Sequence, residues 1–261
     1  FVLFGMLCIS INDVVIKALS GDYPLHQMVF VRSAIGLIFS IALVQLEGGW
    51  RILRTRRPGL HILRGLMIVA ANMAFFAALA VIPLAETTAL FFVAPLFITL
   101  LSIPFLGEKV GPRRLAAVVV GFLGVLAMMR PWGGDLPADR WVLLLPVAAA
   151  LCYAGMQILT RRLGAESKAS ALAVYIQGMF LIVGGAFYLV AGDGRFAAGV
   201  ENPSLVFLLR AWAWPTPEDW PFFGLIGAIS AAVGYSLSQA YRSAPAATVA
   251  PFEYVALPLA L

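Results

Sequence analysis

The sequence predicts an all-α polytopic membrane protein, and two observations carry this prediction. First, 62% of the 261 residues are hydrophobic and only 12% are charged, whereas a soluble domain is about a quarter charged. Second, the apolar residues gather in nine segments, most of them near the roughly 20 residues that cross a bilayer as a helix. The segments are too long for barrel strands and lack their period-two alternation.

Turn sequences rich in glycine and proline separate the nine segments. We expect helices at about 1–19, 24–46, 60–82, 84–106, 114–130, 141–160, 170–192, 219–241 and 245–261. The longest connection, residues 193–218, contains an apolar stretch at 205–214. This stretch is too short to span a bilayer, so it predicts a helix that lies in the interface.

Basic residues alternate from loop to loop and thereby predict the orientation. The basic loops follow the second, fourth and sixth segments and contain Arg51, Arg54, Arg56 and Arg57, then Lys109, Arg113 and Arg114, then Arg161, Arg162 and Lys168. Basic loops stay in the cytoplasm, so the amino terminus is expected there too. The net charge of +5 is therefore explained by membrane orientation, and no nucleic-acid partner is expected.

Two corners marked by proline predict an internal repeat. In residues 82–114 and again in the last segment, a proline opens an apolar run and a second proline interrupts it. Pro83 matches Pro245 and Pro95 matches Pro258, with a spacing that differs by one residue. The mid-segment prolines, Pro95 and Pro258, should kink their helices and are the candidate gating hinges.

The two corners lie five segments apart, so the two copies cross the membrane in opposite directions. This pattern predicts a ten-helix inverted five-plus-five repeat. The first repeat is expected at 1–130 and the second at 141–261, with a tenth helix truncated beyond the end of the sequence.

Polar residues within the apolar segments are the candidate site. Asp13 and Lys17 are four residues apart on one helix face and are expected to form an ion pair or to share a polar neighbour. Tyr153 and Gln157 form a polar stripe that Tyr235 and Gln239 repeat. The expected substrate-binding residues are Asn12, Asn72, Phe75, Tyr153, Gln157, Tyr235, Gln239, Glu253 and Tyr254. For each single polar residue, a packing hydrogen bond between helices is the alternative.

Glu253 differs from the other polar residues because no cation lies within a helical turn of it. An ionisable group inside a membrane segment is costly and is a functional candidate by default. The sequence therefore makes Glu253 the candidate for proton coupling.

Enzyme chemistry finds little support in the sequence. The only two histidines, His26 and His61, lie at the starts of two separate segments, and no His/Cys/Asp cluster has the spacing of metal ligands. No phosphate-binding Walker A loop is present. We expect no catalytic residue, metal or cofactor. A scaffold would not need paired prolines and internal polar stripes.

Two motifs resemble the drug/metabolite transporter superfamily in its EamA-type branch. The first is Phe105-Leu106-Gly107-Glu108-Lys109 followed by a basic turn and a glycine-rich helix, and the second is Tyr241-Arg242-Ser243-Ala244-Pro245 followed by Ala250-Pro251-Phe252-Glu253-Tyr254. The resemblance implies ten helices, an inverted repeat and a central cavity. Members carry amino acids, nucleotide sugars, riboflavin, S-adenosylmethionine and other metabolites, and this chain is similar to amino acid exporters of the bacterial inner (plasma) membrane.

The expected function follows from the resemblance and the cavity residues together. We expect a multi-pass inner-membrane exporter or facilitator of apolar and aromatic amino acids that works by alternating access, as a monomer or weak dimer. Its partners would be a small-molecule substrate and the lipid bilayer. The alternatives are a carrier of S-adenosylmethionine, riboflavin or a nucleotide-like solute and, from other classes, a membrane-embedded enzyme or a scaffold.

Overall fold

The computed structural model describes residues 1–129 and 142–256, and all regular structure within this part is helical. Seven spans there are long and apolar enough to cross a membrane, which confirms the polytopic all-α prediction. The elements are α1 (Val2–Leu19), α2 (Leu25–Glu47), η1 (Trp50–Leu53), α3 (Pro58–Leu79), α4 (Leu84–Phe91), α5 (Ala94–Leu106), α6 (Pro112–Met129), α7 (Leu144–Leu163), α8 (Ala169–Ala191), α9 (Pro203–Leu209), α10 (Trp220–Ser243), α11 (Ala246–Val249) and η2 (Ala250–Ala256).

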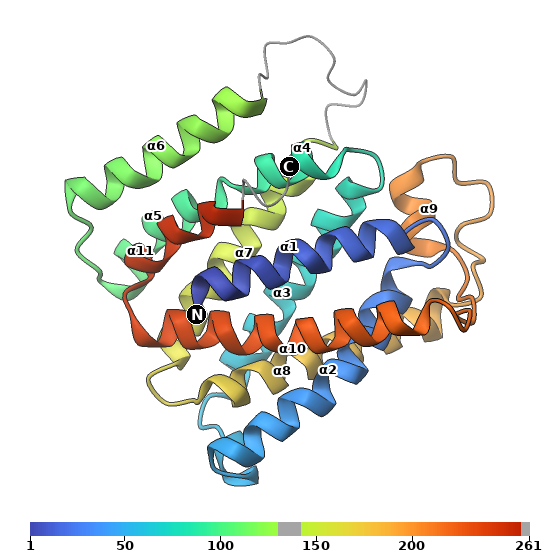
Figure 1. Cartoon of the computed structure of the whole chain (residues 1–261), viewed down its shortest axis with the longest axis horizontal. Coiled ribbons are helices and arrows are strands. Elements are labelled where there is room, and N and C mark those ends of the chain that lie inside the picture. The colour runs from blue at the N-terminus through green and yellow to red at the C-terminus, as the bar shows by residue number, and fades with distance from the viewer. Residues whose placement is uncertain (130–141, 257–261) are drawn as a thin grey trace.

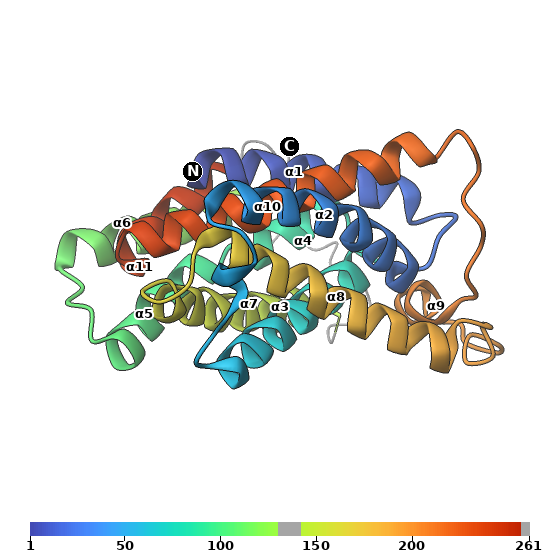
Figure 2. The same cartoon turned by 90° about the horizontal axis from the view of Figure 1, so that it is seen from below.

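The long helices form a bundle with loops at its two ends (Figure 1). Seen from the side, α1 and α10 lie together in one layer, and α3 and α7 lie together in the other (Figure 2). Helix α2 packs against both α10 and α8 and so connects the layers. The short helix α9 lies in the expected interfacial stretch, which confirms a helix there.

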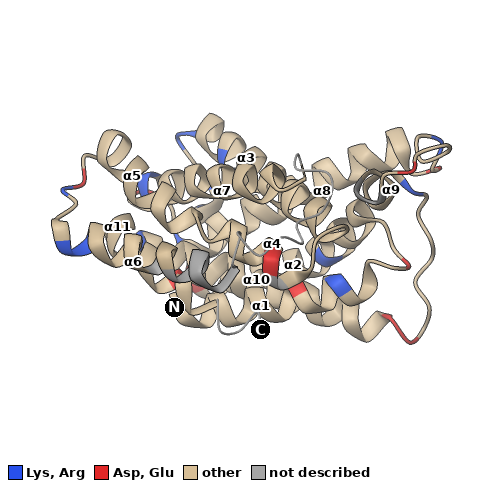
Figure 3. Ribbon diagram, turned by 90° about the horizontal axis from the view of Figure 1, so that it is seen from above, with Lys and Arg blue, Asp and Glu red and all other residues tan. Residues whose placement is uncertain are grey.

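The outer surface of the bundle is apolar between its two ends. Large hydrophobic side chains such as Ile38, Leu189 and Ile182 are exposed on it, with exposed fractions of 69%, 81% and 68%. Charged residues gather mainly in the loops at the ends (Figure 3). Such a surface is suited to lipid rather than water.

The fourth apolar segment is interrupted close to its expected kink. Helix α4 ends at Phe91, and α5 begins at Ala94 with Pro95 in its first turn. A proline is tolerated there because the first N–H groups of a helix have no intrahelical acceptor. The proline therefore lies just after a break between two helices. Its role as a hinge stays a prediction.

The described part of the last segment, expected as one helix, consists of two short pieces. Four residues of α-helix (α11) are followed by the 3₁₀ turns of η2. Pro251 explains the change, because its ring would clash with the carbonyl of an α-helix four residues earlier. The other predicted hinge, Pro258, lies outside the described residues.

The two entry prolines have nearly the same backbone conformation. Pro83 precedes α4 with φ −53° and ψ 148°, and Pro245 precedes α11 with φ −54° and ψ 138°. Each leads into a short helix that is followed by a break or a change of helix type. The inverted relation between residues 1–130 and 141–261 stays a prediction, which these matched corners favour.

Glu108 joins the first corner to the second. Gly107 ends α5 in the left-handed region at φ +66°, a conformation that glycine adopts without strain. The Glu108 carboxylate beyond it accepts hydrogen bonds from the backbone N–H groups of Ala246 (2.8 Å) and Ala247 (3.0 Å). Arg161 Nε lies 3.9 Å from the same carboxylate. A side chain following α5 thus caps the first turn of α11.

Replacing Glu108 with alanine should loosen α11. The change removes the acceptor of two backbone N–H groups, a loss that costs about 1 kcal/mol at a helix start. We expect the amide protons of Ala246 and Ala247 to exchange roughly fivefold faster, as measured by hydrogen exchange in lipid nanodiscs. Glu86→Ala, which removes an acidic residue from the first turn of α4, is the matched control. Unchanged exchange in Glu108→Ala would show that the cap is energetically irrelevant.

Candidate functional site

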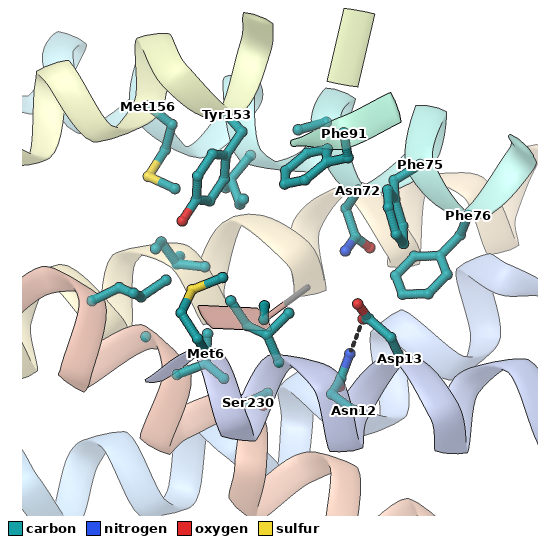
Figure 4. Close-up of a pocket in the computed structure, with 18 of the residues that line it drawn as sticks. Met6, Asn12, Asp13, Asn72, Phe75, Phe76, Phe91, Tyr153, Met156 and Ser230 are labelled. Carbon is teal, nitrogen blue, oxygen red and sulfur yellow. Dashed lines mark hydrogen bonds between the residues drawn. The ribbon is translucent and has the colours of Figure 1, made fainter. Parts of the chain in front are cut away.

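A cavity of about 170 Å³ lies between the two layers of the bundle. Seven α-helices contribute to its lining, namely α1, α2, α3, α4, α7, α8 and α10, and η2 contributes Ala256. Both predicted halves of the chain therefore supply walls. Figure 4 shows this cavity with its labelled side chains directed into the space between the helices.

One wall of the cavity is aromatic. The rings of Phe75 on α3, Phe91 on α4 and Tyr153 on α7 lie in a row. The ring centroids of each neighbouring pair are 5.3 Å apart. These are edge or tilted contacts of the kind that aromatic rings prefer. Met156 extends this wall beside Tyr153, and Met6 on α1 lies across the cavity from them (Figure 4). The wall offers flat and polarisable surface to a ligand.

A polar cluster occupies the region around Asp13. The Arg32 guanidinium donates to the side-chain oxygens of Asn12 (3.3 Å) and Asn72 (3.2 Å) and lies 5.2 Å from the centroid of the Phe180 ring. Asn12 in turn donates to Asp13 at 3.1 Å (Figure 4). Because its oxygen is held by Arg32, the Asn72 amide nitrogen is left as a donor at the cavity.

The expected ion pair between Asp13 and Lys17 is not formed. Lys17 Nζ donates instead to the carbonyl of Leu79, which lies in the last turn of α3. The last four carbonyls of a helix lack intrahelical partners, and the negative end of the helix dipole attracts a cation. Asp13 accepts from Asn12 and faces the cavity. Partners from neighbouring elements therefore replace the pair that spacing alone suggests.

Amide and hydroxyl groups form a second polar region. Gln157 on α7 donates to the Tyr153 hydroxyl at 2.7 Å, and Gln177 on α8 donates to Ser230 on α10 at 3.0 Å. The Gln157 side-chain oxygen is buried and has no hydrogen-bond partner among the described residues. A buried acceptor without a partner is costly, so this oxygen is a natural point of contact for a ligand.

Five of the predicted binding residues line the cavity, namely Asn12, Asn72, Phe75, Tyr153 and Gln157. The second polar stripe does not. Tyr235 donates to Glu47 at 2.9 Å, and Gln239 accepts from Arg242 at 3.4 Å. Helix α10 turns a different face, which includes Gly234 and Leu237, towards the cavity. The repeated Tyr-x-x-x-Gln pattern therefore predicted the same role for two stripes that lie in different surroundings.

Glu253 and Tyr254 lie behind the cavity wall. The Tyr153 hydroxyl donates to Glu253 at 3.0 Å, and the Tyr241 hydroxyl donates to the same oxygen at 2.5 Å. Tyr254 donates to the carbonyl of Val118 at 3.2 Å. Glu253 is thus connected to the cavity through Tyr153 and does not itself line it.

The sequence analysis missed Arg64, a fully buried cation on α3. Its guanidinium donates to Thr160 Oγ1 on α7 (2.7 Å), the carbonyl of Leu172 on α8 (3.0 Å) and Ser238 Oγ on α10 (3.1 Å). It also lines the cavity. A single arginine within an apolar segment was the available signal, because such a charge needs internal partners.

Comparisons with known proteins place the chain in a family. A riboflavin transporter of Rhizobium johnstonii is 30% identical over 237 residues, which are 91% of this chain and 71% of that protein. Residues 1–130 match the EamA-like transporter family. This chain belongs to the EamA-like transporter family. The family lies within the drug/metabolite transporter superfamily, and the resemblance seen in the sequence is confirmed.

Other relatives of this chain are named for different substrates. An S-adenosylmethionine uptake transporter of Rickettsia prowazekii is 24% identical over 98% of this chain and 79% of its own length. A pseudopaline exporter of Pseudomonas aeruginosa is 26% identical over 95% of this chain and 79% of its own length. One solved crystal structure, 20% identical, has the same fold, with a TM-score of 0.75 over 99% of this chain and 84% of that one.

The family establishes this protein as a membrane transporter, and the relatives are transporters rather than enzymes. It is a multi-pass membrane protein of a bacterial transporter family. No group of three or more metal-ligating side chains occurs in the described part of the chain. The cytoplasmic location of the amino terminus stays a prediction.

Replacing Arg64 with methionine should destabilise the bundle. The variant loses three interhelical hydrogen bonds, each worth about 0.6 kcal/mol in a membrane, or about 2 kcal/mol together. We expect a lower midpoint of thermal unfolding in detergent. Arg56→Met, at an exposed loop position, is the control and should leave the midpoint unchanged. An Arg64→Met midpoint equal to that of the wild type would mean that the guanidinium contributes no net stability.

Proposed function

We propose that this protein carries a planar, nitrogen-rich aromatic metabolite of the riboflavin type across the membrane by alternating access through the central cavity. The observation that carries the proposal is the aromatic wall of Phe75, Phe91 and Tyr153 facing the polar cluster around Arg32 in one cavity. Pockets that orient such ligands combine apolar surface with a few placed polar groups.

The aromatic wall suits the face of a flat heterocycle. A fused ring can stack on or meet the edges of Phe75 and Phe91, as aromatic rings do with one another. The edge of a flavin-type ring alternates carbonyl acceptors with an N–H donor. The Arg32 guanidinium and the Asn72 amide supply donors for such acceptors, and the Asp13 carboxylate supplies an acceptor.

The second polar region suits a hydroxylated substituent. Gln157 offers a buried oxygen that has no partner among the residues described, while Gln177 and Ser230 form a donor–acceptor pair on facing helices. Hydroxyl groups both donate and accept, so a sugar-alcohol chain can bond with either kind of group. The riboflavin transporter of Rhizobium johnstonii supports this substrate class.

Amino acid export, expected from the sequence, remains the second candidate. Asp13 and Arg32 lie in one polar cluster and provide opposite charges for an ammonium and a carboxylate. The aromatic wall would then hold the side chain. The relatives described above are named for riboflavin, S-adenosylmethionine and pseudopaline, so we place amino acids second. S-adenosylmethionine, with both an amino acid head and an aromatic base, combines the two requirements.

Alternating access finds support in the interrupted helices. The break between α4 and α5 and the change from α11 to η2 both occur in cavity-side segments. Interrupted helices at matched positions of two halves are typical of transporters with inverted repeats. We propose residues 1–130 and 141–261 as these halves, with Pro95 in the moving part of the first.

Transport of radiolabelled riboflavin into proteoliposomes tests the proposal. We expect uptake above that of empty liposomes, and an initial rate roughly tenfold lower for Asn72→Ala. The reason is that a lost hydrogen bond of about 1.4 kcal/mol weakens affinity tenfold. Gln157→Ala should act in the same direction, whereas Gln239→Ala, which changes the same residue type away from the cavity, should not.

Two results would contradict parts of this proposal. If phenylalanine or S-adenosylmethionine moves and riboflavin does not, the substrate class is wrong and the transport function stands. If Gln239→Ala slows transport and Gln157→Ala does not, the cavity assignment is wrong.

A further inference from the structure

We infer that Glu253 is a proton-binding site that couples substrate movement to proton movement, and that Tyr153 transmits its protonation state to the cavity. This inference rests on the proposed transport function. It concerns a residue behind the wall, which the substrate itself does not reach in this structure.

Glu253 is a buried carboxylate, and in the described part of the chain its side-chain hydrogen bonds come from hydroxyl groups. It is 2% exposed, and one of its oxygens accepts from Tyr153 on α7 (3.0 Å) and Tyr241 on α10 (2.5 Å). Among the described residues, no cationic group lies within 4.0 Å of it. Two neutral donors leave a buried negative charge without a counter-ion, and taking up a proton removes that charge.

The other elements around Glu253 supply no neutralising group. The segment η2 packs against α1, α5, α6 and α11. Helices α5 and α11 contain no titratable residue, and the two arginines of α6, Arg113 and Arg114, are exposed in its first turn. Of the titratable residues of α1, Cys8 is buried, while Asp13 and Lys17 bond to other partners.

Two further titratable side chains lie close by. Tyr254 follows Glu253 in the chain and donates to the carbonyl of Val118. Glu108 is near Tyr241 but caps α11 and lies 3.9 Å from Arg161. Its charge therefore already has partners. Glu253 is the carboxyl group here whose charge only a proton can neutralise.

The hydrogen bonds connect the protonation state of Glu253 to the orientation of the Tyr153 hydroxyl group at the cavity. With Glu253 ionised, the Tyr153 hydrogen is directed to the carboxylate, and the Tyr153 oxygen accepts from Gln157. A carboxylate only accepts, whereas a carboxylic acid also donates. Once protonated, Glu253 donates to a tyrosine oxygen, and the Tyr153 hydrogen becomes free to turn towards an acceptor on the substrate.

Proton and substrate thus favour the same state. A substrate acceptor stabilises the outward-turned Tyr153 hydroxyl, which requires protonated Glu253, and by linkage the proton strengthens substrate binding equally. In each cycle Glu253 takes one proton from the side where substrate enters and releases it from the same carboxyl oxygen on the other side. This coupling between Glu253 and Tyr153 therefore predicts symport of substrate and proton.

Proteoliposomes with an imposed pH gradient test the coupling. Wild-type protein should accumulate riboflavin several-fold above equilibration when the gradient drives protons inward. Glu253→Gln should keep tracer exchange but accumulate riboflavin only to equilibrium. Glu166→Gln, at a half-exposed ion pair with Arg57, is the matched control and should behave as the wild type. Two results would overturn the inference and leave the transport function standing. In one, the pH gradient has no effect on riboflavin accumulation by the wild type; in the other, Glu253→Gln still accumulates riboflavin above equilibrium.

A second measurement does not depend on substrate or on the glutamine variant. Infrared difference spectra of the detergent-solubilised wild type should show a protonated carboxyl band that disappears as the pH rises. In Tyr241→Phe, which removes one donor to the carboxylate, its midpoint should move to higher pH. If riboflavin does not move at all, the proposed substrate fails while this titration still decides the proton site. A band that is absent, or whose midpoint Tyr241→Phe leaves unchanged, would rule Glu253 out.

Discussion

The buried Arg64 guanidinium is the interaction on which the arrangement around the cavity depends most. In the hydrocarbon region of a bilayer a polar side chain has no water to bond with, so its hydrogen-bond partners must come from the protein. Arg64 finds one partner on each of α7, α8 and α10, and Arg32 does the same with Asn12 and Asn72 on α1 and α3. These two side chains fix helices from both layers, and they leave polar groups at the cavity with apolar wall between them.

Several charged side chains of this protein form hydrogen bonds with backbone groups at helix ends or with side-chain amides, rather than ion pairs with one another. Lys17 satisfies a carbonyl in the last turn of α3, and Glu108 satisfies N–H groups in the first turn of α11. Helices that end inside a membrane protein leave such groups without partners, and the helix dipole favours a cation at one end and an anion at the other. The pairing of Asp13 with Lys17 fails for this reason.

The sequence predicted the positions of the helices well, because each apolar run needs a fixed length to cross the bilayer and turn residues mark its ends. The proline corners were predicted for a similar local reason. The rotation of each helix was harder. An apolar segment carries little contrast between its faces, so nothing local shows that Tyr153 faces the cavity while Tyr235 faces Glu47. Arg64 could have been predicted from the sequence by the rule that a lone charged residue within a membrane segment has internal partners or a functional role.

Some polar residues of this protein join helices, and others line the cavity. This distinction offers a physical reason for the similarity between relatives that are named for different substrates. The hydrogen bonds of Arg64 and Glu108 join helices and corners to one another, so this frame can stay the same while the solute changes. The aromatic wall and the amides around Arg32 line the cavity, and they are the surfaces that we propose a solute meets. One frame can therefore serve transporters named for riboflavin, S-adenosylmethionine and pseudopaline. Tyr153 belongs to both sets, since it forms part of the wall and bonds to Glu253, so in the proposed mechanism substrate binding and proton binding meet at one hydroxyl group.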